Sequence, residues 1–217
     1  IRLGATTVTD DREGDLLEPA DPEVLARVDA DAIAQAAAPL TGAIMQSPSA
    51  VSAIKVDGKR AYDLVRAGEE VELKQRPVTV YEFSLGAPRA ATLASGEPVI
   101  DIDAIVRCSS GTYVRALARD LGKALGVGGH LVALRRPAVG PFSVDDAILM
   151  EQLVSGETPS LHSPAAIAAT LFPMINLTEQ QTIDLSQGKS LSLPDAADAP
   201  VVGALAEERG SGGGDAG

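Results

Sequence analysis

Hydrophobic and polar residues alternate along residues 100–108. Apolar side chains occupy every second position, at Ile100, Ile102, Ala104, Val106 and Cys108. Successive side chains of an extended chain point to opposite faces, so this period of two predicts a β-strand with one buried face. The Ser-Ser-Gly sequence at residues 109–111 then predicts a tight turn. Cys108 closes the apolar face, and we expect it to pack in the core rather than act as a reactive thiol.

A helical pattern begins after this turn, at Thr112. Apolar residues recur three and four positions apart, at Val114, Leu117, Ala118, Leu121 and Leu125. This spacing predicts an amphipathic helix, with Arg115 and Arg119 together on one face. Tyr113 and Arg115 are expected in its first turn, beside backbone N–H groups that have no partner within the helix. The Gly-Val-Gly-Gly sequence at residues 126–129 should end the helix, and residues 131–134 should form another buried strand.

Weaker patterns predict the remaining elements. Residues 29–39 are rich in Ala and predict a helix that Pro39 stops, and residues 88–98 predict a loop. The Val-Asp-Gly-Lys sequence at residues 56–59 is typical of a hairpin turn, and residues 60–67 predict a short helix closed by Gly68. Ser163 before a Pro and Thr178 three residues before Gln181 are typical helix N-caps, and Gly188 should end the second of these helices.

Charge is unevenly distributed along the chain. The net charge is −12, from 18 basic and 30 acidic residues. Residues 107–136 nevertheless contain six basic residues and one acidic residue, which indicates a polyanion or a buried acidic partner at this place. Residues 9–31 hold nine acidic residues, and we expect them to form a solvated loop and helix lead-in that faces away from such a polyanion. The acidic total argues against loose, nonspecific binding of nucleic acid.

Length and composition restrict the class of protein. The 217 residues are enough for one sizeable core and a small appendage. Neither a stretch of about 18 apolar residues nor a signal peptide is apparent, so we expect no membrane partner. A single cysteine excludes an internal disulfide and is typical of the reducing cytoplasm.

Several chemistries find no support in the sequence. His130 and His162 are far apart and no cysteine pair accompanies them, so we expect no metal site, and we interpret His130 as structural. Phosphate-binding glycine motifs are missing, so we expect no nucleotide or other cofactor. The Ser-Ser-Gly turn also lacks the pattern of a serine hydrolase elbow.

Tyr113 and Arg115 leave two interpretations open. A helix N-terminus after a Ser/Gly turn attracts anions, and a Tyr beside an Arg can stack on a base while the cation meets a phosphate or carboxylate. In the alternative interpretation, Tyr113 only packs on the sheet and Arg115 is a solvated helix residue. The residues alone favour this second interpretation.

Several motifs in order resemble one family. The sequence Cys-Ser-Ser-Gly-Thr-Tyr-Val-Arg-Ala-Leu-Ala-Arg-Asp-Leu-Gly at residues 108–122 and Gly-Gly-His-Leu-Val-Ala-Leu-Arg-Arg at residues 128–136 are similar to the late motifs of the tRNA pseudouridine synthase B family, which makes the T-loop pseudouridine at tRNA position 55. Residues 1–4 with 9–14, and residues 46–62, 67–68 and 76–81, match further motifs in the same order. The resemblance covers about residues 1–150.

The resemblance implies a fold and an activity. It implies the pseudouridine synthase fold, an α/β (α+β) mixed sheet flanked by helices, and isomerisation of uridine without metal or organic cofactor. It implies that Tyr113 packs against the flipped base and that Arg115 pairs with the nucleophilic carboxylate. Leu134 would supply an apolar wall, and Lys55, Lys59 and Arg60 would contact RNA phosphates. The partner would be the T-arm stem-loop of tRNA, bound by a monomer.

The resemblance also implies a domain division. Residues 1–150 would form the catalytic domain, with residues 49–77 as an RNA-gripping insert. Residues 151–173 would be a linker and helix, residues 174–209 a small PUA-like, β-rich RNA-binding domain, and residues 210–217 a flexible tail. By composition alone, the insert is a surface of mixed charge.

One motif of the family has no match here. Its nucleophilic aspartate lies in a Gly-x-Leu-Asp-Pro-x-Ala-Thr-Gly sequence, upstream of the segment that Ile1 begins. We therefore expect the chain to be a fragment that is inactive by itself. The alternative function is a noncatalytic RNA-binding or scaffolding fragment, and a further alternative is a domain whose basic patch meets an acidic protein.

Overall fold

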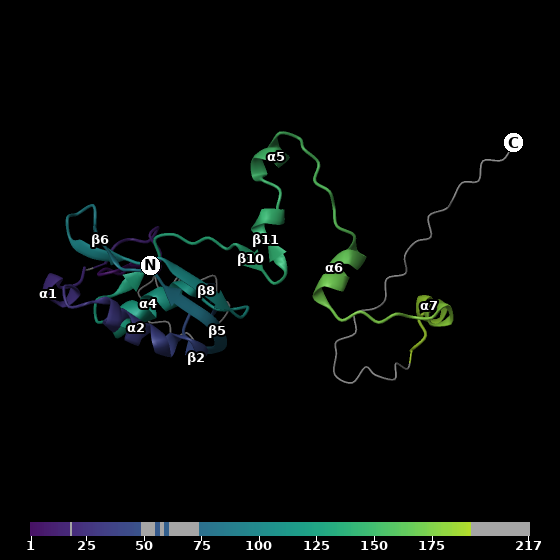
Figure 1. The fold of residues 1–217 in the computed structure, drawn as a ribbon, viewed down its shortest axis with the longest axis horizontal. Helices are drawn as coiled ribbons and strands as arrows, with labels where there is room; N and C mark the ends of the chain where they lie inside the picture. Colours follow the sequence, from purple (N-terminus) through teal and green to yellow (C-terminus); the bar gives the residue numbers. More distant parts are fainter. Residues whose placement is uncertain (18, 49–54, 57–58, 61–73, 192–217) are drawn as a thin grey trace. The chain divides into compact units, whose positions relative to one another are not determined.

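A computed structural model describes residues 1–17, 19–48, 55–56, 59–60 and 74–191 (Figure 1). The chain divides into two compact units, Ile1–Arg135 and Arg136–Gly217. Strands and helices of the first unit are interleaved along the sequence, so the expectation of a mixed α/β architecture is confirmed.

Two antiparallel sheets form the first unit. One has the strand order β6-β7-β1-β9, with β1 at Arg2–Leu3, β6 at Arg89–Thr92, β7 at Pro98–Asp101 and β9 at Gly129–His130. The other has the order β2-β5-β8, with β2 at Gly42–Gln46, β5 at Arg76–Leu85 and β8 at Ala104–Cys108. Strand β3 (Lys55–Val56) pairs antiparallel with β4 (Lys59–Arg60), in agreement with the predicted hairpin, and residues 57–58 between them lie outside the described residues.

The alternating segment at residues 100–108 is extended, but it serves both sheets. Its first part is β7, which pairs with β1, and its second part is β8, which pairs with β5. The change occurs at Ile102, whose N–H donates to the carbonyl of Ile1 at 2.8 Å. Ile102 is 1% exposed and lies in the core. Burial alternates along β8 as predicted but not along β7, and the single strand predicted over residues 100–108 is wrong.

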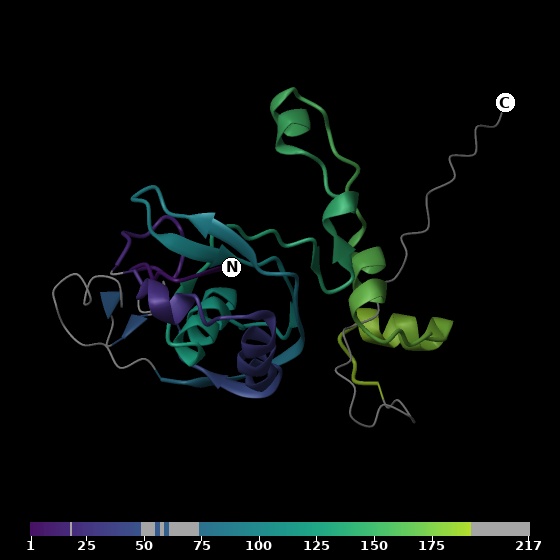
Figure 2. The same ribbon diagram turned by 60° about the vertical axis from the view of Figure 1, so that its left-hand side comes forward.

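Two helices cover this framework (Figure 2). Helix α2 (Ala30–Ala37) follows the short helix α1 (Pro22–Leu25) and ends in the 3-10 turn η1 (Ala38–Leu40), which confirms the predicted stop at Pro39. Asp29 caps α2 by accepting from the N–H of Ala32. Helix α4 (Val114–Ala124) packs against α2, β1 and β9.

The core lies where α2 and α4 meet the first sheet. Leu117, Ala118 and Leu121 of α4 are completely buried, and Val114 and Leu125 pack partly buried against the same cluster. The predicted apolar face of the helix is thereby confirmed. The other members come from β1, α1, α2, the glycine-rich bend after α4 and three positions next to strand ends (Ile1, Ile102 and Leu131): Ile1, Leu3, Leu25, Ile33, Ala37, Ile102, Val127 and Leu131.

Two local predictions are wrong. Residues 88–98 contain β6, which forms a hairpin with β7. Residues 131–134 do not form a strand, because the sheet ends at His130. Leu131 instead donates its N–H to the carbonyl of Asp10 at 3.0 Å and makes one isolated bridge to Asp11. The backbone of Leu131 thus bonds to a turn rather than to a sheet neighbour.

The second unit consists of short elements. They are the hairpin of β10 (Ala138–Val139) and β11 (Phe142–Ser143), the 3-10 turn η2 (Val144–Asp146), and the helices α5 (Met150–Val154), α6 (Pro164–Leu171) and α7 (Glu179–Ser186). Ser163 caps α6, and Thr178 and Gln181 form a capping box on α7, as predicted. Within the described residues, no helix is long and apolar enough to cross a membrane.

Candidate functional site

Tyr113 stands at the boundary between a turn and a helix. Gly111, with φ of +81°, completes the turn in the left-handed conformation that favours glycine. Tyr113 has extended dihedral angles (φ −94°, ψ 101°) and is the N-cap of α4, one position before the first helical residue. The prediction that it lies within the first turn is off by this one position. Its side chain is half-buried.

The backbone of Tyr113 is held by a side chain distant in sequence. The Gln46 side chain accepts from the N–H of Tyr113 at 2.9 Å and donates to its carbonyl at 3.3 Å. Gln46 is the last residue of β2 and is 1% exposed. Because buried polar groups require hydrogen-bond partners, this pairing explains why a glutamine is tolerated there.

Arg115 is paired with an acidic residue from the beginning of the chain. Its Nε donates to a carboxylate oxygen of Asp11 at 2.8 Å. The Arg115 side chain is 45% exposed and that of Asp11 is 20% exposed. Within the described residues, the two terminal nitrogens of this guanidinium carry no hydrogen bond or ion pair. They can therefore accommodate a second carboxylate in the planar geometry that arginine favours.

Arg119, one turn further along α4, has several partners. Its guanidinium lies 3.3 Å from a carboxylate oxygen of Asp10 and 2.9 Å from one of Asp120. It also donates to the carbonyls of Ser47 at 2.9 Å and Pro48 at 3.4 Å. Arg119 thus connects the helix to the acidic turn and to the segment that follows β2.

The turn around Asp10 and Asp11 joins three parts of the unit. Its side chains meet α4, and its backbone meets Leu131, which follows β9. Asp10 has a φ of +57°, a conformation that aspartate tolerates better than most residues. Asp10 is also only 9% exposed. The prediction of a solvated loop is therefore wrong at this turn, because two arginines attract its carboxylates.

The remaining predicted residues lie elsewhere. Leu134 is 58% exposed, in the segment after β9. Lys55, Lys59 and Arg60 lie in the β3–β4 hairpin, and the placement of their side chains is outside the described part of the chain. The predicted helix at residues 60–67 lies outside it except for Arg60, which belongs to β4 instead. In the described ranges, no cluster of three or more His, Cys, Asp or Glu side chains could hold a metal.

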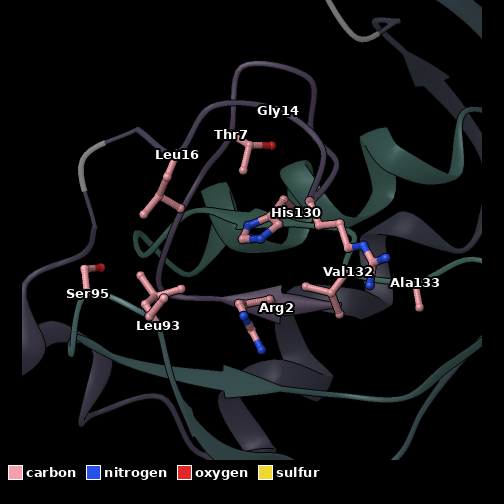
Figure 3. A pocket seen from close by; sticks show the side chains of 11 residues that line it. Arg2, Thr7, Gly14, Leu16, Leu93, Ser95, His130, Val132 and Ala133 are labelled. Carbon is pink, nitrogen blue, oxygen red and sulfur yellow. The ribbon is translucent and has the colours of Figure 1, made fainter.

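A cavity of about 580 Å³ lies beside the same turn. Figure 3 shows its lining, with His130 near the centre of the view. Burial lowers the pKa of His130, although its ring also contacts the carbonyl of Ala5 at 2.9 Å. A neutral ring that donates through Nδ1 satisfies this contact. The His130 ring thus bonds to the backbone beside β1, in keeping with the structural role that the sequence suggested.

Comparisons with known proteins identify the family. Residues 1–114 match the model of the TruB family pseudouridylate synthase N-terminal domain, and residues 115–174 match that of the tRNA pseudouridylate synthase B C-terminal domain. The chain belongs to the TruB family of pseudouridylate synthases. The resemblance seen in the sequence motifs is confirmed, and with it the pseudouridine synthase fold.

Individual relatives agree with this assignment. The chain is 54% identical over 194 residues to tRNA pseudouridine synthase B of Leifsonia xyli, which covers 89% of this chain and 62% of the relative. It is 48% identical over 192 residues to the protein of that name from Corynebacterium diphtheriae, covering 88% and 62%. The chain thus spans about 62% of the length of these relatives. A crystal structure of a Cbf5-Nop10-Gar1 complex matches 59% of this chain and 31% of its own, with 29% identity and a TM-score of 0.38.

Sequence reasoning missed three residues of this site. Asp10 and Asp11 were assigned to an exposed acidic stretch, and Gln46 was noted only as the start of a motif. A usable signal existed for the aspartates, since two adjacent carboxylates match two arginines that are four apart on one helix face. No comparable signal marks Gln46, because its partner is a peptide group.

Proposed function

We propose that this chain forms part of an enzyme that isomerises uridine to pseudouridine in the T-loop of tRNA. Membership of the pseudouridylate synthase family carries the proposal. The reaction breaks the N-glycosidic bond, turns the uracil ring and rejoins it to the ribose through carbon. A base that undergoes this chemistry must leave the helical stack and be held while it is detached.

Arg115 is the residue to which we assign control of the nucleophile. Its Nε is occupied by Asp11, which fixes the direction of the guanidinium plane. Its terminal nitrogens would receive a second partner, which we assign as the nucleophilic carboxylate of the family. A cation within about 4–6 Å of a carboxylate favours its ionised form. A hydrogen bond from the same cation would orient the carboxylate for attack. The Arg115–Asp11 contact thus supports a role in positioning rather than in phosphate binding.

Tyr113 is the residue to which we assign contact with the base. Its main chain is fixed on both sides, by Gln46 and by the N–H of Ala116, which donates to the Tyr113 carbonyl at 3.1 Å. Tyr113 is only half-buried, so part of the residue is accessible to a base that stacks on it. Leu134, which is exposed after β9, would complete an apolar wall.

RNA binding is assigned to the more distant segments. We propose that residues 49–77 grip the T-arm through Lys55, Lys59 and Arg60, and that residues 174–209 form a PUA-like RNA-binding domain. The catalytic domain would then extend to about residue 150, with a linker and helix at residues 151–173. We further propose that the protein works as a monomer in the cytoplasm, without metal or organic cofactor.

Release of tritium from a T-arm stem-loop labelled with 5-tritiated uridine tests the activity. The full-length protein should release tritium at the T-loop uridine, and mapping of the product should place pseudouridine there. Residues 1–217 alone should be inactive, because they contain no match to the nucleophile motif. The same RNA with 5-tritiated cytidine at the target position is the matched control substrate.

Two results would contradict the proposal. Binding of the stem-loop by the full-length protein without any tritium release would favour the RNA-binding alternative. Tritium release by residues 1–217 alone would show that the nucleophile lies within the chain, and the role assigned to Arg115 would then need a different partner.

A further inference from the structure

Gln46 is an unusual residue for the inside of a protein. It is 1% exposed, and glutamine is mostly found at the surface. Its side chain makes two hydrogen bonds, both to the main chain of Tyr113, which is 67 residues away in sequence. An apolar side chain could fill the same volume without needing any partner. Packing alone therefore does not account for the glutamine.

The two hydrogen bonds resemble those that a neighbouring β-strand would make. The side-chain oxygen accepts from the Tyr113 N–H at 2.9 Å, and the side-chain nitrogen donates to its carbonyl at 3.3 Å. Both peptide groups that flank the Tyr113 Cα are thereby fixed. The φ and ψ angles of Tyr113, and hence the direction of its Cα–Cβ bond, follow from this pairing.

From this geometry we infer that Gln46 is a positioning residue, whose side-chain amide fixes the main chain of Tyr113 and so aims the Tyr113 ring at the base. The inference rests on the proposed function for its catalytic meaning. The Gln46 side chain forms hydrogen bonds only with the main chain of Tyr113, so these bonds do not engage the ring that would meet the substrate. The same contact fixes the start of α4, two residues before Arg115.

A second contact supports the inference independently. Arg119 donates to the carbonyls of Ser47 and Pro48, the two residues that follow Gln46. The segment at residues 46–48 is therefore attached to α4 at two points, one at the N-cap and one on the second turn. Two attachments keep α4 from rotating or sliding relative to the segment after β2. The position of Tyr113 is therefore coupled to the position of that segment.

Three variants of the full-length protein test this role. Gln46→Met removes both hydrogen bonds while preserving length, and Gln46→Glu replaces the donor with an oxygen. Gln35→Met is the matched control, since Gln35 is exposed on α2. Gln46→Met should lower kcat on the T-arm stem-loop by about tenfold to a hundredfold, because misplacement of a catalytic group by 1 Å can cost about a hundredfold. The KM should stay within about threefold, and the control should match wild type.

Gln46→Glu adds a readout that a purely structural role would not produce. An ionised carboxylate repels the Tyr113 carbonyl, whereas a neutral carboxyl offers one donor and one acceptor, as the amide does. Burial raises the pKa of a carboxyl group. The kcat of Gln46→Glu, relative to wild type, should therefore recover as the pH is lowered. Arg115, Arg119 and Asp11 are the same in every variant, so recovery confined to Gln46→Glu reports on position 46.

Labelling with 3-fluorotyrosine separates this inference from the proposed function. The fluorine resonance of Tyr113, identified by its loss in Tyr113→Phe, should shift in Gln46→Met while that of Tyr81 stays in place. If the wild type makes no pseudouridine, the proposed function fails, and this shift still decides the role of Gln46. An unmoved Tyr113 resonance, or a kcat within about twofold of wild type in active Gln46→Met, overturns the inference. If Gln46→Met does not fold, the pH profile of Gln46→Glu decides, and a kcat ratio that does not change with pH overturns it.

Discussion

Gly122 of α4 lies directly against the backbone of the segment that follows the helix. A Cβ atom there would lie 2.1 Å from the carbonyl carbon of Gly128 and 2.2 Å from the nitrogen of Gly129. Both are backbone atoms, which cannot move aside as a flexible side chain would. Gly122→Ala should therefore force the helix or the Gly128–Gly129 segment to shift. Overpacking of a core costs about 1–3 kcal/mol, against about 1 kcal/mol gained in helix propensity.

Because the contacts are with backbone atoms at about 2 Å, the steric cost should lie in the upper half of this range, about 2–3 kcal/mol, so we expect Gly122→Ala to lower the free energy of unfolding by about 1–2 kcal/mol. Urea denaturation measures this change, and Ala124→Gly, at an exposed position of the same helix, measures the propensity term separately. Because α4 also carries Arg115, kcat should fall by about tenfold or more. A variant as stable as wild type would show that the contact at Gly122 yields without cost, and the account of this packing would be wrong.

Three further predictions concern the site and the sheet. Arg115→Lys keeps the charge but loses the planar fork of the guanidinium, so kcat should fall by a larger factor than RNA affinity does. A kcat within about threefold of wild type, which corresponds to roughly 0.7 kcal/mol of activation free energy, would contradict the pairing role. Tyr113→Phe should keep its RNA affinity in fluorescence titrations, whereas Tyr113→Leu should lose about 1–3 kcal/mol of binding free energy. A Tyr113→Leu variant with a lower melting temperature but unchanged RNA affinity would show that the residue belongs to the core. The hydrogen bond from Arg2 lowers the pKa of Asp101 below its usual 3.8, so Asp101 stabilises the fold above that pH and loses this effect as the pH falls through the lowered value. Asp101→Asn should accordingly lower the urea midpoint at pH 7 and approach the wild-type value in acid; a difference that persists in acid would assign the effect to packing.

Local patterns in the sequence predicted the local structure well. The apolar face of α4, the caps at Ser163 and Thr178 and the β3–β4 hairpin are all present. Each depends on residues within about four positions of one another, where spacing determines which side chains meet. The stop of α2 at Pro39 has the same origin, because proline cannot donate the hydrogen bond that a helix interior requires.

Contacts between distant segments were not predictable in this way. Arg115 and Asp11 are 104 residues apart, and Gln46 and Tyr113 are 67 apart. The spacing of Arg115 and Arg119 matches two adjacent carboxylates but does not specify which acidic pair of the chain they meet, and nothing around Gln46 specifies its partner. The division of residues 100–108 between two sheets was likewise not predictable. The alternation of apolar and polar residues predicts which face of a strand is buried, but it does not predict which strand is its neighbour.

Contacts between distant segments also determine which basic side chains at residues 107–136 are paired with acidic ones. The excess of basic residues at residues 107–136 first indicated a surface for a polyanion, but half of these cations are already paired. Arg115 and Arg119 contact Asp11 and Asp10, and Arg107 lies 3.8 Å from Glu82. Within the described residues, the basic side chains of this window that have no such partner are Lys123, Arg135 and Arg136, all exposed. An arginine whose charge is balanced by a fixed carboxylate attracts phosphate weakly, yet its orientation is well defined. Under the proposed function, the exposed cations without such partners would meet the RNA backbone, and Arg115 would hold the catalytic carboxylate in place.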